Sequence, residues 1–382
     1  MRTYEQHLHA VRAQVDKPQV VTRPLAEAGG LVAASTLTAQ FDLPRFDNSQ
    51  MDGYALDSTA GGVFRVGQTL AAGTEPKPLH EGVATPIMTG AKVPAGTVTI
   101  VPVERCHPPH FGAEGQEIQV PAAPQGQFIR RRGEDMAAGQ VIVAEGTRLN
   151  PAAIGTLAAQ GVTEVAVYAP ARLLLCTGGA EIGQGAAKIP DSNAPLLMAA
   201  AKQYGLEVAG HVRTNDDPEA LRADLEHAVR RHRPDAIVTS GGISQGKFEV
   251  IRQLLTDGWF GHVAQQPGGP QGLAQFIGVP VLCLPGNPLS TLVSFRLYVA
   301  PVLGVARPPQ MARLTAGVPG IPGRDQFRRG QLTHTARATA DAEVLPGAGS
   351  HLLAHALEAT ALIRIPAGAT LQAGDRVEVF PC

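Results

Sequence analysis

Three short apolar runs, each followed directly by a glycine-containing loop, constrain the fold of this chain more than any other feature. The runs are Leu173–Cys176, Ala236–Val238 and Val281–Leu284, and the loops are Thr177-Gly178-Gly179, Ser240-Gly241-Gly242 and Pro285-Gly286-Asn287-Pro288. Each run is typical of a short buried strand, and helical patterns lie between the runs. Strands that alternate with helices in this way predict a parallel, doubly wound sheet.

The loops also predict a ligand site. Glycine adopts positive φ and has no Cβ, so backbone N–H groups can approach an anion closely. Parallel strands end at the same edge of a sheet, where open α/β domains bind phosphorylated ligands. We expect the three loops together to form a crevice for such a ligand. The alternative is that the loops are ordinary turns of an α/β domain.

Composition excludes several classes of protein. Among 382 residues, 32 are Lys or Arg and 33 are Asp or Glu, which argues against a protein that coats nucleic acid or a membrane surface. No apolar run approaches the roughly 18 residues of a membrane span, and the first residues lack the apolar core of a signal peptide. The four cysteines form no CxxC pair, which argues against a cysteine zinc site. We expect a cytoplasmic protein without nucleic-acid or membrane partners.

The rest of the chain predicts further domains. Residues 1–40 have a helical pattern, in which Pro24 opens a second amphipathic stretch. Residues 60–135 contain short alternating runs between Gly and Pro clusters and are predicted to be rich in strands. Residues 150–160 predict a capped helix, followed by a strand. After Pro308, short strands with glycine turns predict a small β-barrel or sandwich.

Five segments of the chain resemble, in the same order, the motifs of the molybdopterin molybdenumtransferases, the family of MoeA and the E domain of gephyrin. They are DNSQMDGYAL at 47–56, IMTGAKVP at 87–94, RRRGED at 130–135, TSGGIS at 239–244 and LPGNP at 284–288. Residues 349–368, GSHLLAHALEATALIRIPAG, are similar to the family's C-terminal domain. The resemblance covers nearly the whole chain.

The resemblance implies a multidomain α/β fold. Its parts are an elongated α/β linking domain at 1–48 and 139–170, a β-rich domain at 49–138, a MogA-like glycine-loop domain at 171–308 and a C-terminal β-barrel at 309–382. It implies a homodimer in which the glycine-loop domain of one subunit faces the β-rich domain of the other across the site. It also implies that the protein takes adenylylated molybdopterin and molybdate, releases AMP, and works with molybdopterin-handling proteins and molybdoenzymes.

The motifs imply the site residues as well. The catalytic set implied by the resemblance is Asp52, Thr89, Asp135 and Glu181, and the substrate-binding set is Gly178, Gly241, Gly242, Ser244, Pro285, Gly286, Asn287 and Pro288. The implied Mg²⁺ ligands are Glu181, Asp216 and Glu249. Carboxylates beside anionic substrates need a divalent cation between them, because like charges repel.

Local structure offers an alternative role for most of these acids. Asp52 precedes Gly53 and is a typical turn residue. Asp135 lies in a mixed charge run of the kind that usually forms a solvated face. Asp216 precedes a predicted helix and is a candidate N-cap, as is Asp217.

The chain departs from the family pattern in the second half of the site. The lysine-rich KPGKP of the family is replaced by QPGGP at 266–270, which removes point charges that would attract an oxyanion. Glu249 stands where the family has aspartate, and the first glycine loop carries one added residue. The sequence therefore leaves three hypotheses open: an enzyme of reduced activity, a non-catalytic paralogue that binds molybdopterin or the finished cofactor, and a scaffold.

Overall fold

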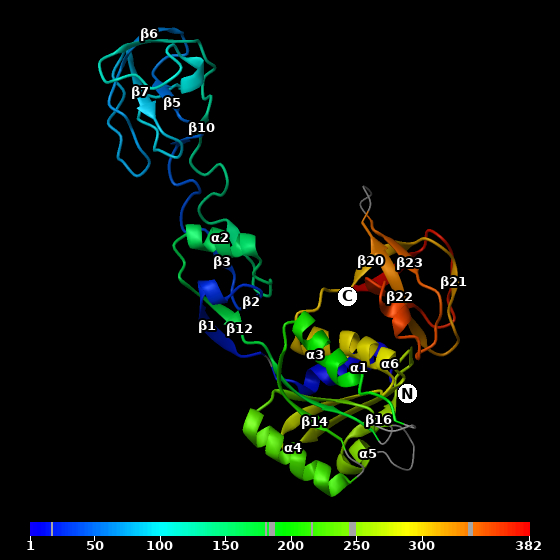
Figure 1. The fold of residues 1–382 in the computed structure, drawn as a ribbon. Helices are drawn as coiled ribbons and strands as arrows, with labels where there is room; N and C mark the ends of the chain where they lie inside the picture. Colours follow the sequence, from blue (N-terminus) through cyan, green and yellow to red (C-terminus); the bar gives the residue numbers. More distant parts are fainter. Residues whose placement is uncertain (17, 180–181, 183–187, 215–216, 244–249, 335–338) are drawn as a thin grey trace. The chain divides into compact units, whose positions relative to one another are not determined.

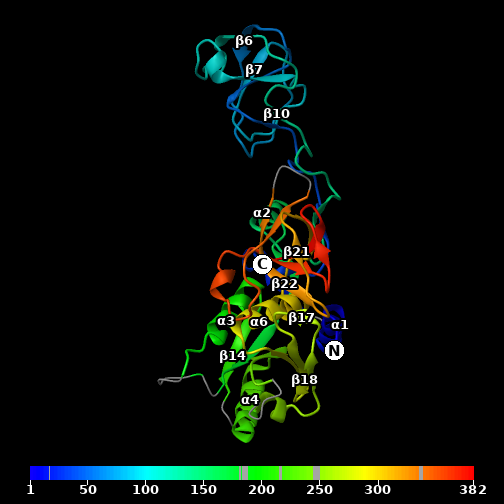
Figure 2. The ribbon, with the colours of Figure 1, turned by 90° about the vertical axis from the view of Figure 1, so that its right-hand side faces the viewer.

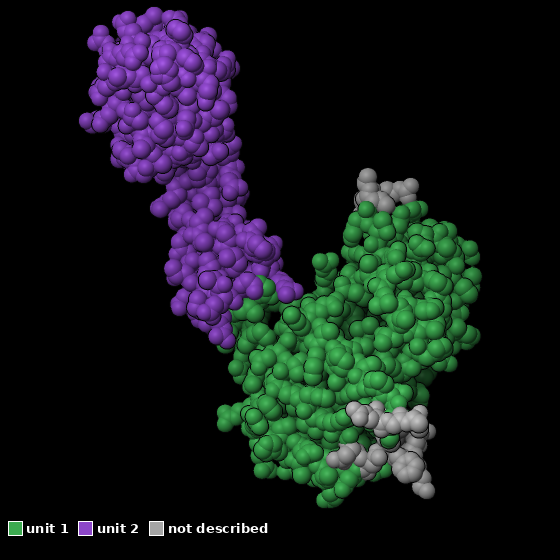
Figure 3. Space-filling model, viewed as in Figure 1, with its two compact units in different colours: residues 1–21, 30–32, 167–382 green, residues 22–29, 33–166 purple. Residues whose placement is uncertain are grey.

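The computed structural model describes residues 1–16, 18–179, 182, 188–214, 217–243, 250–334 and 339–382. These residues form two compact units, shown in two colours in Figure 3. Unit 1 comprises residues 1–21, 30–32 and 167–382, and unit 2 comprises residues 22–29 and 33–166.

Unit 1 is built on a six-stranded sheet whose strands follow the order β14-β13-β15-β19-β18-β16. The strands are β13 (Arg172–Thr177), β14 (Glu207–Arg213), β15 (Ala236–Ser240), β16 (Trp259–His262), β18 (Pro270–Phe276) and β19 (Val279–Leu284). The first four in this order are parallel, and β18 is antiparallel to both of its neighbours. This sheet confirms the predicted α/β domain.

Helices cover both faces of the sheet (Figures 1 and 2). One face carries α3 (Asn193–Gln203) and α6 (Pro288–Ser294), which continues through a π-helical stretch (Phe295–Val299) into α7 (Ala300–Leu303). The other face carries α4 (Pro218–His232) and α5 (Val250–Leu254). The helix α4 shows why these segments are helical: Asp217 accepts hydrogen bonds from the N–H groups of Glu219 and Ala220, and Pro218 occupies the first turn.

The sequence did not predict the strands β16, β17 (Gln265–Gln266) and β18, because glycine and proline interrupt them. The glycines make room for aromatic rings. A Cβ at Gly272 would lie 2.5 Å from the ring of Phe260, and a Cβ at Gly261 would lie 2.7 Å from the ring of Trp259. Packing across the sheet therefore outweighs the low strand propensity of glycine.

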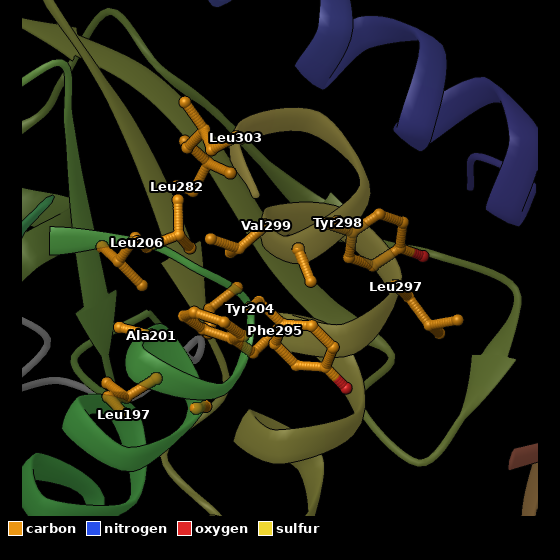
Figure 4. Packing of buried hydrophobic residues seen from close by; sticks show 14 of the residues in the cluster. Leu197, Ala201, Tyr204, Leu206, Leu282, Phe295, Leu297, Tyr298, Val299 and Leu303 are labelled. Carbon is orange, nitrogen blue, oxygen red and sulfur yellow. The ribbon is translucent and has the colours of Figure 1, made fainter. Parts of the chain in front are cut away.

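The core of unit 1 is a cluster of side chains from α3, the helical stretch after Pro288, and the sheet (Figure 4). Figure 4 shows Leu197, Ala201 and Tyr204 facing Phe295 and Val299. The N-terminal helix α1 (Tyr4–Gln14) packs on the same core through Tyr4, whose ring lies 5.3 Å from that of Phe327. Of the helices in the described residues, none has the length and apolar character needed to cross a membrane.

A buried histidine on α1 makes the stability of unit 1 dependent on pH. His7 is 1% exposed and lies against the rings of Tyr298 and Trp259. Burial, and secondarily the charge of Arg2, lowers the pKa of His7 to about 3. The unfolded chain binds a proton at this residue below pH about 6.5, whereas the folded chain stays neutral. Stability present at pH 7 is therefore lost as the pH falls from about 7 towards 3.

We expect His7→Phe to reduce this pH dependence. Between pH 7.5 and pH 5, the wild type should lose roughly 1–2 kcal/mol more unfolding free energy than the variant, measured by urea denaturation followed by fluorescence. The exposed His9 serves as control, because His9→Phe should leave the pH dependence unchanged. Equal losses in the wild type and in His7→Phe would contradict the prediction.

The helical pattern predicted for residues 24–37 is wrong. The structure shows strand β1 (Val20–Pro24), a single 3-10 turn (Leu25–Glu27), and strands β2 (Val32–Ala33) and β3 (Leu37–Thr38) in this region. Pro24 lies at the end of a β-branched run, and the Gly29–Gly30 pair interrupts the stretch. Strand pairing of β1 and β2 with β12 (Glu164–Tyr168) then determines the local structure.

The C-terminal part of unit 1 is a closed five-stranded barrel. Its strands are β20 (Gln310–Leu314), β22 (Asp325–Thr333), β23 (Asp341–Val344), β24 (Ala361–Ile365) and β26 (Arg376–Pro381). The ring is closed by five pairings: β22 with β23, β23 with β20, β20 with β26, β26 with β24, and β24 with β22. Strands β21 (Val318–Pro319) and β25 (Thr370–Leu371) form a separate pair. The predicted C-terminal β-barrel is confirmed.

Unit 2 is rich in short strands, as predicted. Its main sheet has the order β8-β5-β7-β6-β9. The strands are β5 (Gly53–Leu56), β6 (Gly62–Val66), β7 (Val83–Ile87), β8 (Thr99–Pro102) and β9 (Glu117–Val120). Two small pairs join β4 (Asn48–Ser49) to β10 (Ile129–Arg130) and β3 to β11 (Val141–Val143). The helix α2 (Pro151–Ala159) begins at its predicted N-cap, Asn150. The boundaries of the four domains stay a prediction.

Candidate functional site

The three glycine loops of unit 1 meet at the carboxyl edge of the sheet. A Cβ at Gly241 would lie 3.3 Å from the carbonyl oxygen of Gly178 and 3.6 Å from the Cα of Gly286. The strand order reverses between β13 and β15, because β14 and β15 lie on opposite sides of β13. Ligands of open α/β sheets bind in the crevice at such a reversal. The structure thus brings the sequence-predicted loops together at the position expected for a ligand.

The loop glycines adopt conformations that other residues avoid. Gly178, Gly241 and Gly242 have φ values of 136°, 89° and 70°. Neighbouring atoms also exclude a side chain, since a Cβ at Gly178 would lie 2.5 Å from the Thr214 hydroxyl oxygen. Glycine is therefore required here by both strain and space.

We expect Gly178→Ala to weaken ligand binding at the loops, because the added methyl group forces Gly178 and Thr214 apart. The expected result is a loss of AMP affinity of roughly tenfold or more, measured by calorimetry. Gly155→Ala is the matched control, because no atom lies within 4 Å of the position of its Cβ. Unchanged affinity in Gly178→Ala would contradict the requirement for glycine.

The third loop is fixed by buried hydroxyl groups. The Thr291 hydroxyl donates to the carbonyl oxygen of Pro285 at 2.6 Å, and the Ser240 hydroxyl lies 3.1 Å from that of Thr291. Asn287 is the N-cap residue of α6, and Pro288 occupies its first turn. The predicted rigid floor of the site is therefore consistent with the hydrogen bonds of this loop.

In unit 2, the structure brings Asp52 and Thr89 together. Gly53 on β5 pairs with Ile87 on β7. This pairing brings Asp52, the residue before Gly53, close to Thr89, two residues after Ile87. The Oδ1 atom of Asp52 accepts hydrogen bonds from the backbone N–H and from the hydroxyl of Thr89, both at 2.7 Å. These bonds lower the pKa of Asp52, the side-chain bond most strongly. Asp52 is thus an exposed, ionised carboxylate with a fixed orientation.

Asp135 lies beside the same motif. It lines a shallow pocket with Gln50, Arg130 and Glu134, and its backbone N–H donates to the carbonyl oxygen of Leu43 at 3.0 Å. Asp135 is exposed, so the structure places it where a ligand can reach it.

The charge run around Asp135 has a defined structure. Arg131 pairs with Asp47 at 2.7 Å, and Arg132 pairs with Asp42 at 2.6 Å. Burial acts to raise the pKa of Asp47, but the backbone N–H of Arg132 and the Arg131 guanidinium outweigh it and lower the pKa. These pairs tie residues 131–132 to residues 42–47, so this run is more than a solvated face.

Several predicted site residues lie outside the described residues: Glu181, Asp216, Ser244 and Glu249. They include all three predicted metal ligands. Within the described part of the chain, no group of three or more His, Cys, Asp or Glu side chains could hold a metal ion. The metal ligand set stays a prediction.

Sequence reasoning missed a cationic pocket in unit 1. Gln266 and Pro267, from the QPGGP segment at 266–270, line this pocket together with Arg328 and Arg329 of β22. The pairing of β17 with β22 brings the two segments together. The pocket volume is about 10 Å³, room for about one water molecule. An arginine doublet inside a strand pattern was the only signal in the sequence.

The two arginines of this pocket have no carboxylate partner among the described residues. Arg329 donates to the carbonyl oxygens of Leu352, Pro346 and Gly347, which fixes its position. The buried Nε atom of Arg328 has no partner among the described residues. Burial lowers the pKa of both arginines. The guanidinium group of arginine nevertheless stays charged at neutral pH in proteins. Uncompensated guanidinium groups in a pocket are suited to an anion.

Comparisons with known proteins agree with this architecture. Family models match three parts of the chain: the MoeA N-terminal region (domains I and II) at residues 2–161, the probable molybdopterin binding domain at 171–304, and the MoeA C-terminal region (domain IV) at 311–382. A crystal structure of the molybdopterin biosynthesis MoeA protein from Pyrococcus horikoshii is 28% identical, has a TM-score of 0.72, and aligns over 99% of this chain and 98% of its own.

Two curated relatives are similar over nearly their full length. Molybdopterin molybdenumtransferase 2 of Mycobacterium tuberculosis is 35% identical over 412 aligned residues, which cover 100% of this chain and 99% of the relative. The molybdopterin molybdenumtransferase of Synechococcus elongatus is 33% identical and covers 99% of this chain and 98% of its own length. The chain therefore belongs to the molybdopterin molybdenumtransferase (MoeA) family.

Proposed function

We propose that this protein completes the molybdenum cofactor by transferring molybdenum from molybdate to adenylylated molybdopterin, with release of AMP. The observation that carries the proposal is the Arg328–Arg329 pocket, which offers positive charge without a carboxylate partner in the described residues. It lies in the same unit as the glycine loops, which are suited to phosphate groups. A cationic pocket and a phosphate crevice match the two anionic substrates.

The pocket requires a rearrangement to admit the oxyanion. A volume of about 10 Å³ accommodates a water molecule but not a tetrahedral oxyanion. Arg328 would be the side chain that moves, because its only hydrogen bond within the described residues is a long one, 3.4 Å to the carbonyl oxygen of Leu345. Arg329 would stay in place as the fixed cation.

The carboxylates would act through Mg²⁺. The ligands proposed from the sequence are Glu181, Asp216 and Glu249, and a bound ion would neutralise phosphate charge and stabilise the leaving AMP. Asp52 is suited to the same task from unit 2, because its second carboxylate oxygen, Oδ2, has no partner among the described residues. We further propose a cytoplasmic homodimer in which Asp52, Thr89 and Asp135 of one subunit complete the site on the other.

The test is release of AMP from adenylylated molybdopterin in the presence of molybdate and Mg²⁺, with an active family member assayed in parallel. We expect release that depends on both molybdate and Mg²⁺. Release no faster than in the absence of protein, while the relative is active, would overturn the proposal.

One observation favours a second candidate, a non-catalytic protein that binds molybdopterin or the finished cofactor. The chain has glutamine and glycine at 266 and 269, where the family has lysine. Tight binding of the ligand without turnover would identify this function. The Gln266→Lys, Gly269→Lys double variant should then gain AMP release, because it restores positive charge beside Arg328.

A further inference from the structure

Unit 2 contains a second pocket, which the proposed reaction does not use. Its volume is about 450 Å³, a size typical of sites for small organic molecules. Residues of two segments, 75–78 and 92–97, form its walls, and Asp47 and Arg131 complete the lining. The lining is therefore partly apolar, with prolines from both segments, and partly charged.

This pocket has its own set of residues. Asp52, Thr89 and Asp135 are absent from its lining. Arg130 lines the shallow pocket beside Asp135, whereas the next residue, Arg131, lines this one, and the two pockets have no described lining residue in common. A ligand of this pocket would therefore be additional to the substrates of the proposed function.

Two ion pairs lie in the lining, and they differ in how firmly the acid is held. Asp47 accepts from the Arg131 guanidinium at 2.7 Å and from the backbone N–H of Arg132 at 2.8 Å. The carboxylate of Glu75 contacts only Lys92 among the described residues, and its side chain is 78% exposed. Because an exposed ion pair of this kind contributes little to stability, Glu75 is the acid that a ligand can replace.

The backbone around Glu75 does not hold it in place either. In the described structure, residues 75–78 make no hydrogen bond to another backbone group, and two of them are prolines, which have no N–H. The next anchor along the chain is Leu79, whose N–H donates to the carbonyl oxygen of Ala95 at 3.1 Å. Segments with few hydrogen bonds open at a low cost in free energy, so Glu75 can leave its partner without a change in the sheet.

Lys92 stays in place when its partner leaves. Its backbone forms an antiparallel bridge with Asn48, and its ammonium group lies 5.9 Å from the centre of the Phe46 ring. The charge of Arg131 is balanced by Asp47, so Lys92 is left as the one unbalanced charge in the described lining. A fixed cation beside apolar walls is suited to an anion that carries an apolar body.

We propose that this pocket binds a small organic carboxylate, whose charged group replaces that of Glu75 on Lys92. The apolar body of the ligand lies against three proline rings, those of Pro76, Pro78 and Pro94. A single lysine balances the charge of a carboxylate, but only part of the charge of a phosphate group. Glu75 is thus an internal competitor for the ligand.

The test uses benzoate and benzamide as probes of the full-length protein, with binding followed by saturation-transfer NMR. The two molecules have nearly the same shape, but only benzoate is charged. We expect benzoate to bind roughly fivefold or more tightly than benzamide, because it alone pairs with the ammonium group. Acetate, which lacks the ring, should also bind more weakly than benzoate. Equal affinity for benzoate and benzamide, or tighter binding of inorganic phosphate than of benzoate, would overturn the inference.

Two substitutions with opposite expected effects test the competition. Lys92→Gln should lower the affinity for benzoate roughly tenfold, because it removes the charge that binds the carboxylate. Glu75→Gln should raise this affinity roughly two- to fivefold, because it removes the internal competitor. Lys77→Gln and Glu81→Gln are the matched controls, since they remove the same charges at exposed positions outside the lining, and they should leave the affinity unchanged.

Circular dichroism and the melting temperature establish that each variant is folded. Unchanged or reduced affinity in Glu75→Gln, or equal effects in the controls, would contradict the role of Glu75 as a competitor. Absence of benzoate binding in the wild type would show that the ion pair only closes the segment. Failure of the AMP-release test would overturn the proposed function and leave this site unaffected, because the two share no residue.

Discussion

Replacing Asp52 with asparagine should lower the rate of AMP release by a factor on the order of 10² or more, the usual contribution of one charged catalytic group. Asparagine keeps the oxygen that accepts both hydrogen bonds from Thr89, so the local structure should persist. Asparagine removes the negative charge that, in the proposed function, interacts with a bound cation. The measurement is kcat for AMP release at saturating Mg²⁺.

The Thr89 variants provide the control for this result. Thr89→Ser keeps the hydroxyl that donates to Asp52 and should retain most of the activity, whereas Thr89→Val removes it. The hydroxyl bond lowers the pKa of Asp52, so its loss should raise that pKa. Because the active form is the carboxylate, the acid limb of kcat/KM should move to higher pH in Thr89→Val. Full activity of Asp52→Asn would show that Asp52 is only a turn residue.

The second large effect is expected at Arg328. Arg328→Gln should raise the KM for molybdate by roughly 10- to 100-fold, the equivalent of one charge-assisted hydrogen bond, with a smaller change in kcat. The reason is that Arg328 is the guanidinium with a buried, unpartnered Nε in the pocket beside Gln266. Arg329 is less suitable as a test, because its three bonds to carbonyl oxygens also hold residues 346–352 in place.

The matched control is Arg324→Gln, which removes the same charge at an exposed position four residues earlier in the chain. It should leave the KM for molybdate within twofold, and raising the salt concentration should not remove the difference between the two variants. An equal effect of both substitutions would show that net charge, and not the pocket, attracts the oxyanion.

The sequence predicted the structural features that depend on local chemistry. The loops at Gly178, Gly241 and Gly286 were recognisable because each follows an apolar strand, and the structure brings all three into contact. The helix α4 was recognisable from its capping residues, and the barrel from its short strands. The neighbourhood of Asp52 and Thr89 followed from their motifs, which two paired strands bring together.

Other features were not predictable, because they depend on contacts between distant segments. The Arg328–Arg329 pocket forms only when β22 pairs with β17, about sixty residues earlier. The hydrogen bonds from His211 to Gly286 join three strand ends and a helix, and His211, Asp191 and Asn193 belong to none of the sequence motifs. Residues 24–37 were read as helical, and their strands follow from pairing with β12.

The sequence by itself determined the alternating strands and helices at the centre of unit 1, the turns that only glycine allows, and the family, because each of these depends on residues close together in the chain. Only the tertiary structure decided which polar atoms of the described residues are buried without a partner, among them Arg328 Nε, Asn193 Oδ1 and Asn287 Oδ1. The physical reason is that a buried hydrogen-bonding group is available to a ligand only where the fold supplies no partner for it. The possible partners come from segments distributed over the whole chain.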